Sequence, residues 1–225
     1  MSRAWQPSAT IDALRQRAGI INQIRQFFAE RGVLEVDTPA LSHAAVSDPF
    51  LHPFATDFVP EGGGQAATLY LHTSPEYPMK RLLAAGSGPI WQLCKVFRNG
   101  EVGRRHNPEF SMLEWYRPGF DHHQLMDEVD ALVCTVLESA PARRITYADA
   151  FAEHTGLDVH SCSDADLQKL AASRCGFAGE LSRDGYLNLL FAECVEPALQ
   201  APTMVYAFPA SQAALAQIVE GDDRV

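Results

Sequence analysis

Residues 90–116, with the sequence IWQLCKVFRNGEVGRRHNPEFSMLEWY, decide the fold of this chain. The two ends of the stretch, residues 90–97 and 109–116, are rich in aromatic and aliphatic side chains, and such runs favour β-strands. The polar residues 98–108 lie between them. The stretch therefore predicts a β-hairpin whose two strands are joined by a long loop.

The second strand of this hairpin carries a carboxylate among aromatic side chains. Because side chains alternate between the two faces of a strand, the even-numbered residues from Phe110 to Tyr116 share one face, and Glu114 lies among them. A carboxylate in apolar surroundings needs a partner, so Glu114 is a candidate for binding a cationic group. Phe110 is able to stack on a planar ring. The same pattern also fits a core phenylalanine beside a half-exposed glutamate.

The loop between the two strands is locally basic in an acidic chain. Lys and Arg number 18 against 28 Asp and Glu, which gives a formal charge of −10. Guanidinium groups bind phosphate through paired hydrogen bonds, so the loop suits a compact anion such as a triphosphate. The alternative is a solvated turn without a ligand. The loop sets one acid, Glu101, against four basic residues, Arg98, Arg104, Arg105 and His106.

A second acid begins the helix that precedes the hairpin. Residues 69–73 read as a strand, and Ser74 is expected to cap a helix over residues 75–85 with Pro75 at its first position. Glu76 in the first turn is typical of an acid that complements the helix dipole. Together with Glu114 it can instead form a pocket of two carboxylates, which would select an amine-bearing substrate such as lysine.

The N-terminal third of the chain is expected to begin with a long amphipathic helix. Apolar residues recur at steps of three and four over residues 11–31, with Thr10 as the cap and Gly32 as the stop. An edge strand follows over residues 33–39. Residues 42–68 read as loops around one short strand at 54–58.

The rest of the chain predicts mainly helices. Asp121 and Gln124 form a capping box before an amphipathic helix. Residues 143–200 contain three short helices, and residues 204–208 form a final strand. The expected caps of these three helices are Thr146, Ser163 and Ser182, and the expected stops are Gly156 and Gly176.

Composition narrows the class of protein. The 225 residues suit a globular fold, and the negative charge disfavours wholesale nucleic-acid binding. The five cysteines lie far apart without a C-x-x-C pair, and the histidines lack metal-ligand spacing, so we expect neither a disulfide framework nor a metal site. No window approaches the ~20 apolar residues of a membrane span. These features predict a soluble cytoplasmic protein.

The hairpin residues resemble a known family. Residues 97–99 and 105–114 are closely similar to motif 2 of the class II aminoacyl-tRNA synthetases of the lysyl type. Residues 32–41 resemble motif 1, and residues 73–82 resemble the amino-acid-binding loop and helix of the same class. Aspartyl and asparaginyl relatives usually have Gln at the position of Glu76, so the resemblance implies the lysyl branch.

Within that branch, residues 112–118 and 208–212 resemble a free-standing group of paralogues. The resemblance implies an α+β class II catalytic domain, an antiparallel sheet flanked by helices, as one domain over residues 1–225. Only about ten residues precede the first helix, so no anticodon-binding domain is expected. The metal-binding acids and motif 3 of the family would follow Val225, so the C-terminal strands are expected to be missing.

The resemblance also implies a chemistry. It implies an ATP-dependent ligase, with ATP and Mg²⁺ as cofactors, that activates (R)-β-lysine or lysine as an acyl-adenylate. The acyl group would then pass to a lysine ε-amine of elongation factor P, with no role for tRNA. Motif 1, with Pro39, would build a homodimer interface. The alternatives are a minimal lysyl-tRNA synthetase core and a non-catalytic nucleotide- or lysine-binding remnant.

The resemblance assigns roles to individual residues. Arg98 would be catalytic at the α-phosphate of ATP, His106 would lie near the β- and γ-phosphates, and Phe110 would stack on adenine. Gly100 stands where the family usually has Glu, so local contacts there are expected to differ. The full ATP-binding set is Arg98, Asn99, Gly100, His106 and Phe110; the substrate-binding set is Ser74, Pro75, Glu76, Glu114 and Tyr116. No metal ligand is assigned within the chain.

Overall fold

The computed structural model describes residues 6–48, 51–104 and 106–218. The chain divides into two compact units, Met1–Leu137 and Glu138–Val225. All five cysteines are free thiols. Within the described ranges, no helix has both the length and the apolar character needed to cross a membrane.

The centre of the first unit is the predicted hairpin. Strands β5 (Ile90–Phe97) and β6 (Glu109–Tyr116) pair antiparallel along their full length, from Ile90 opposite Tyr116 to Phe97 opposite Glu109. Strand β1 (Leu34–Glu35) lies at the edge beside β5, but it runs parallel to it. The sheet is antiparallel in its β5–β6 pair, as expected, and parallel at the β1 edge. Parallel neighbours need a long connection, which the 54 residues between β1 and β5 supply.

Two helices bury the odd-numbered face of β6. They are α1 (Ile11–Ala29) and α3 (His122–Leu137), and the ring of Phe28 stacks on Trp91 with centroids 5.0 Å apart. Thr10 caps α1 as expected, but the predicted apolar face is buried only in its C-terminal half. Ile11 and Leu14 are 58% and 48% exposed in the described chain. The apolar spacing of the first turns therefore predicted a face that is not buried there.

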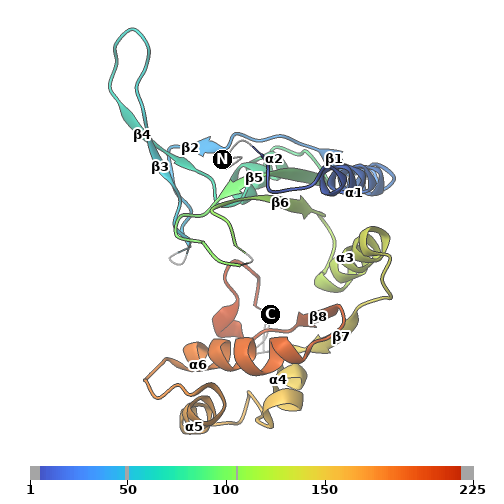
Figure 1. Cartoon of the computed structure of the whole chain (residues 1–225), viewed down its shortest axis with the longest axis vertical. Coiled ribbons are helices and arrows are strands. Elements are labelled where there is room, and N and C mark those ends of the chain that lie inside the picture. Colours follow the sequence, from blue (N-terminus) through green and yellow to red (C-terminus); the bar gives the residue numbers. More distant parts are fainter. Residues whose placement is uncertain (1–5, 49–50, 105, 219–225) are drawn as a thin grey trace. The chain divides into compact units, whose positions relative to one another are not determined.

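A second sheet of three antiparallel strands follows in the chain. It has the order β2 (Leu41–Ser42), β4 (Ala67–Leu71) and β3 (Ala55–Phe58), so the last strand along the chain is central. Figure 1 shows β3 and β4 side by side, joined by a loop that projects beyond the ends of both strands. Strand β4 begins and ends two residues before the predicted 69–73, because its register is set by pairing with β3, where Ala55 opposes Tyr70.

Helix α2 (Glu76–Ala84) begins one residue later than predicted. Pro75 is its N-cap, not its first helical residue, and Ser74 lies one residue farther out. The Ser74 hydroxyl nevertheless accepts the backbone N–H of Glu76 at 3.0 Å. This short side-chain-to-backbone turn satisfies one of the N–H groups at the helix start.

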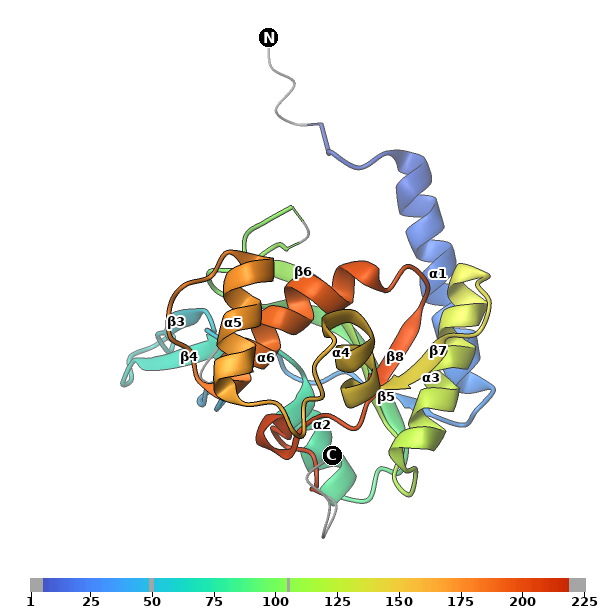
Figure 2. The same cartoon turned by 90° about the horizontal axis from the view of Figure 1, so that it is seen from below.

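The second unit contains a short parallel sheet beside helices (Figure 2). Strand β7 (Arg143–Thr146) pairs with strand β8 (Thr203–Tyr206), with Arg143 opposite Thr203. Strand β7 was not predicted, because its partner lies sixty residues away in the sequence. The core around Tyr147, Phe151 and Leu190 is almost fully buried. The elements are β7 (Arg143–Thr146), α4 (Tyr147–Thr155), α5 (Asp164–Cys175), α6 (Arg183–Leu190), the π-helix η1 (Phe191–Val195), the 3₁₀ turns η2 (Glu196–Ala198) and η3 (Ala210–Gln212), and β8 (Thr203–Tyr206).

The predicted ends of these helices are confirmed. Thr146, Ser163 and Ser182 each accept a backbone N–H from the residue three positions later. Gly156 and Gly176 end α4 and α5 with positive φ angles of 79° and 66°. Glycine is favoured there because it has no Cβ to clash in the left-handed conformation.

Replacing the N-cap residue of α5 tests how much this cap contributes to the stability of the protein. In the capping box the Ser163 hydroxyl accepts the N–H of Asp166 at 3.2 Å, and the Asp166 carboxylate accepts the N–H of Ser163 at 3.0 Å. We expect Ser163→Ala to lower the free energy of unfolding by about 1 kcal/mol, measured by urea denaturation. Ser173→Ala, at an exposed position inside the same helix, is the control. An equal loss in both variants would contradict a specific capping role.

Candidate active site

The carboxylate of Glu114 is held at both oxygens. Ser74 Oγ donates to its Oε2 atom at 2.6 Å, and the Tyr116 hydroxyl donates to its Oε1 atom at 2.7 Å. Tyr116 is two residues along the same strand and so lies on the same face. Ser74 comes from the segment before α2, forty residues away in the sequence. The predicted substrate residues Ser74, Glu114 and Tyr116 are thus brought together.

Glu76 joins this group through Ser74. The Ser74 hydroxyl that donates to Glu114 also accepts the N–H of Glu76, so one hydroxyl links the two acidic residues. The Glu76 carboxylate pairs with Lys80 at 2.5 Å, one turn later in the helix. Burial raises the pKa of Tyr116, and the hydrogen bond to Glu114 and the charges of Glu114 and Glu76 raise it further. Glu114 and Glu76 thus both favour the protonated form of the Tyr116 phenol.

This arrangement has a consequence for the titration of Tyr116. An ordinary tyrosine ionises near about pH 10, so we expect the Tyr116 phenol to stay protonated up to about pH 11. Above about pH 10 the unfolded chain loses a proton that the folded chain keeps, so this contribution to stability falls as pH rises. Spectrophotometric titration checks it: wild type and Tyr116→Phe should ionise the same number of tyrosines below about pH 11. One fewer in the variant would contradict the raised pKa.

The predicted ATP-binding residues Arg98 and Phe110 also meet. The Arg98 guanidinium lies 5.1 Å from the centroid of the Phe110 ring. Its Nη1 atom is 3.6 Å from a Glu101 carboxylate oxygen, and its Nε atom donates to the carbonyl of Thr73 at 3.4 Å. These are long contacts for a guanidinium, which leaves Arg98 able to exchange them for phosphate oxygens.

The remaining predicted ATP-binding residues lie on the loop between β5 and β6. The N–H of Asn99 donates to the carbonyl of His52 at 2.7 Å, which ties the loop to the segment before β3. Gly100 has a φ of 89°, a conformation that disfavours the Glu usual in the family. His106 is exposed and pairs with Gly103 through the backbone, whereas Arg105 lies outside the described residues.

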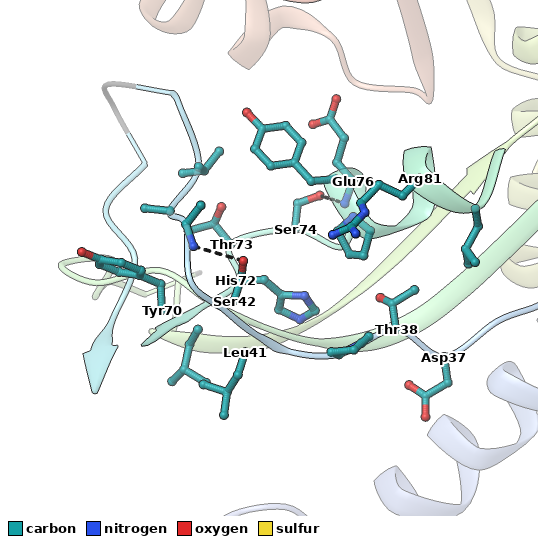
Figure 3. A pocket seen from close by; sticks show the side chains of 18 residues that line it. Asp37, Thr38, Leu41, Ser42, Tyr70, His72, Thr73, Ser74, Glu76 and Arg81 are labelled. Carbon is teal, nitrogen blue, oxygen red and sulfur yellow. Dashed lines mark hydrogen bonds between the residues drawn. The ribbon is translucent and has the colours of Figure 1, made fainter. Parts of the chain in front are cut away.

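A cavity of about 450 Å³ adjoins the start of α2. Its lining includes Ser74 and Glu76, which Figure 3 shows side by side at the helix start, together with the guanidinium-bearing Arg81. Pro39, the predicted interface residue, lies on its wall and is exposed. Arg98, Phe110 and Glu114 are not among the lining residues. The cavity therefore borders Ser74 and Glu76 of the predicted substrate set, between the start of α2 and residues 37–46, but not Glu114.

Sequence reasoning missed several residues of this region. The pairing of Lys80 with Glu76 follows the four-residue spacing of a helical ion pair and could have been found from that spacing. The contact between the hydroxyls of Tyr77 and Ser47, 2.5 Å apart, links α2 to the loop after β2 and has no local signal. In the parts of the chain that the structure describes, no three His, Cys, Asp or Glu side chains cluster closely enough to hold a metal ion.

Comparison with known proteins fits this geometry. Residues 5–224 match the family of tRNA synthetases class II (D, K and N). Because the match spans almost the whole chain, the protein belongs to this class II synthetase family.

Its similarity to individual relatives is closer still. The chain is 56% identical to an elongation factor P–(R)-β-lysine ligase from Vibrio atlanticus, over 100% of this chain and 71% of the relative. It is 56% identical to the protein of the same name from Vibrio vulnificus, again over 100% and 71%. The relative of that name from Erwinia tasmaniensis is 55% identical, over 99% and 70%. The resemblance to the elongation factor P–(R)-β-lysine ligases is confirmed.

Proposed function

We propose that this chain is an ATP-dependent ligase that activates (R)-β-lysine and transfers the β-lysyl group to a lysine ε-amine of elongation factor P. The observation that carries the proposal is the Glu114 carboxylate, whose two oxygens are fixed by the hydroxyls of Ser74 and Tyr116. The names of the relatives supply the particular substrate and acceptor.

The carboxylate pair supports an amine-bearing substrate. An ionised carboxylate has about four lone-pair sites, so Glu114 retains acceptor capacity for an ammonium group after binding two hydroxyls. A substrate with an apolar side chain would leave this charge without a partner, which disfavours its binding. The Glu76 carboxylate lies on the other side of Ser74, where Lys80 already balances its charge, so Glu114 is the main acceptor for the ammonium. The geometry therefore favours lysine-like substrates over neutral amino acids.

The first step proposed is activation of the substrate by ATP. The substrate carboxylate attacks the α-phosphorus of ATP, a phosphoanhydride bond breaks, and pyrophosphate leaves with the electron pair. Arg98 would stabilise charge on the α-phosphate, and Phe110 would stack on adenine and orient it. Mg²⁺ accompanies ATP in this proposal and would neutralise phosphate charge; the described residues supply no ligand cluster for it.

The second step proposed is transfer to the acceptor protein. The neutral ε-amine of a lysine on elongation factor P attacks the acyl carbon of the adenylate, AMP departs, and the amine loses a proton. An amide bond results. The net charge of −10 fits a protein acceptor better than tRNA. We place this activity in the cytoplasm, as the dispersed cysteines without a disulfide pattern predict.

We also propose a homodimer built around motif 1. Pro39 and the apolar residues Ile11 and Leu14 on α1 are exposed, which supports a partner surface in this part of the unit. Light scattering of the purified protein measures the mass directly. A monomeric mass at working concentrations would contradict the dimer without affecting the chemistry proposed.

The function is tested in two assays with the purified chain. Pyrophosphate exchange into ATP should depend on (R)-β-lysine or lysine and should be absent with norleucine, which lacks the ε-amine of the lysine side chain. Incubation with elongation factor P should then add the mass of one β-lysyl group to a single lysine. Charging of tRNA in place of this mass addition would favour the tRNA synthetase alternative. ATP binding without exchange would favour the non-catalytic one.

A further inference from the structure

A buried glutamate lies behind the strand that carries the amine site. Glu128 on α3 is 7% exposed. The indole Nε1–H of Trp115 donates to its Oε2 atom at 3.0 Å, and the Arg117 Nε atom lies 3.3 Å from its Oε1 atom. The second contact is an ion pair by distance, but the N–H is not aligned for a hydrogen bond. The Arg117 guanidinium also lies 4.5 Å from the Phe120 ring centroid.

The two partners of Glu128 flank Tyr116 in the sequence. Along β6 the side chains alternate, so Trp115 packs into the core beside α1 and α3, whereas Tyr116 projects from the opposite face toward Glu114. Arg117, just past the strand end, again contacts α3. One carboxylate thus holds the residues on both sides of Tyr116 from behind the sheet.

Stability alone is a poor explanation for this buried charge. Removing a carboxylate from water is costly, and apolar residues of similar volume often stabilise a core as well or better. The carboxylate of Glu128 instead fixes the positions of two side chains. Its Oε2 atom accepts the Trp115 N–H, and its Oε1 atom faces the Arg117 cation. The neighbouring core, with Leu132 and Phe28, already supplies apolar contacts.

We propose that Glu128 is a positioning residue for the amine-binding site. By fixing Trp115 and Arg117 it fixes the backbone of Tyr116 between them. The Tyr116 hydroxyl can then donate to one oxygen of the Glu114 carboxylate while Ser74 donates to the other. Glu128 itself does not contact substrate. This inference rests on the function proposed above, because it assigns the substrate amine to Glu114.

The consequence is a selective effect on one substrate. In Glu128→Gln the side chain keeps its shape but has a single acceptor oxygen. If that oxygen accepts from Trp115, the amide N–H₂ faces the Arg117 cation; in the other orientation the N–H₂ faces the Trp115 N–H. Loosening Tyr116 should raise KM for (R)-β-lysine by about 10-fold, since small misplacements of a binding group have effects of this order. KM for ATP should change less than about twofold, because Arg98 and Phe110 lie near the other end of the hairpin.

The matched control is Glu109→Gln, which breaks an exposed ion pair with Lys95 at the other end of the same hairpin. It should leave both KM values unchanged. A parallel rise of both KM values in Glu128→Gln, or no rise in either, would overturn the positioning role. Arg117→Lys, which keeps the charge but loses the planar fork, should show the same selectivity with a smaller change, and it serves if Glu128→Gln does not fold.

A second measurement separates this inference from the proposed function. Amide hydrogen exchange should be faster in Glu128→Gln than in wild type at residues 114–116, with unchanged exchange at residues 94–97 of β5, which pair with residues 109–112 of β6. If the wild-type protein shows no lysine-dependent incorporation of pyrophosphate into ATP, the proposed function fails. The amide hydrogen exchange rates would still test whether Glu128 fixes the backbone of Tyr116. Uniformly faster exchange across the hairpin would show general loosening and would refute a local positioning role.

Discussion

Glu114→Gln is expected to lower kcat/KM for (R)-β-lysine in pyrophosphate exchange by about 100-fold or more. Removing one partner of a close, desolvated charge pair typically costs about 2–5 kcal/mol, which corresponds to factors of about 30 to several thousand. The amide would keep the volume and can still accept from one hydroxyl. Its N–H₂ group would face either the Ser74 or the Tyr116 hydroxyl, whose contacts with the carboxylate are 2.6 and 2.7 Å.

The specificity of this loss is as informative as its size. The ratio of kcat/KM for (R)-β-lysine to that for norleucine should fall toward unity, because the carboxylate charge that recognises the ε-ammonium group is gone. ATP affinity, measured by calorimetry, should remain within about twofold. Glu109→Gln on the same strand is the control. If Glu114→Gln retained full preference for lysine-like substrates, the amine would have to bind elsewhere.

Arg98→Ala is expected to lower kcat for adenylate formation by about 100- to 1,000-fold, the usual effect of removing one positioned donor from a developing charge. The Arg98 side chain is 23% exposed and its guanidinium lies over the Phe110 ring, so its removal takes a partly buried cation away from the proposed adenine site. Arg98→Lys should recover only part of the rate, since an ammonium group lacks the planar fork. Rapid-mixing measurement of pyrophosphate release reads the step directly.

Arg143→Ala is the matched control for this change. It removes a guanidinium from an exposed ion pair with Glu153 in the second unit, which should alter neither activation nor substrate binding. If Arg98→Ala and Arg143→Ala behaved alike, the assignment of Arg98 to the α-phosphate would be untenable.

The helix ends of this protein could be predicted because their causes are local. The caps at Thr10, Thr146, Ser163 and Ser182 each bond to a backbone N–H three residues away, and such contacts depend only on nearby sequence. The hairpin was predictable for the same reason, since period-two alternation fixes which side chains share a face. Glu114 and Tyr116 were therefore placed together before any tertiary contact was known.

Pairings between distant segments were not predictable in this way. The parallel contact of β1 with β5 and that of β7 with β8 join residues more than fifty positions apart. Short strands such as β1, with two residues, carry too little alternation to show their direction. The exposed first half of α1 is a similar case: its apolar spacing predicts a buried face, but burial depends on how far the sheet extends.

By itself the sequence determined the class of this protein, its hairpin and the identity of the charged residues in the proposed site. Only the tertiary structure decided their partners: Ser74 between the two acids, the Thr73 carbonyl beside Arg98, and Glu128 behind Tyr116. The physical reason is one of range. Propensity, capping and alternation act over a few residues, whereas hydrogen bonds between side chains from separate elements exist only once packing has set the distances between those elements.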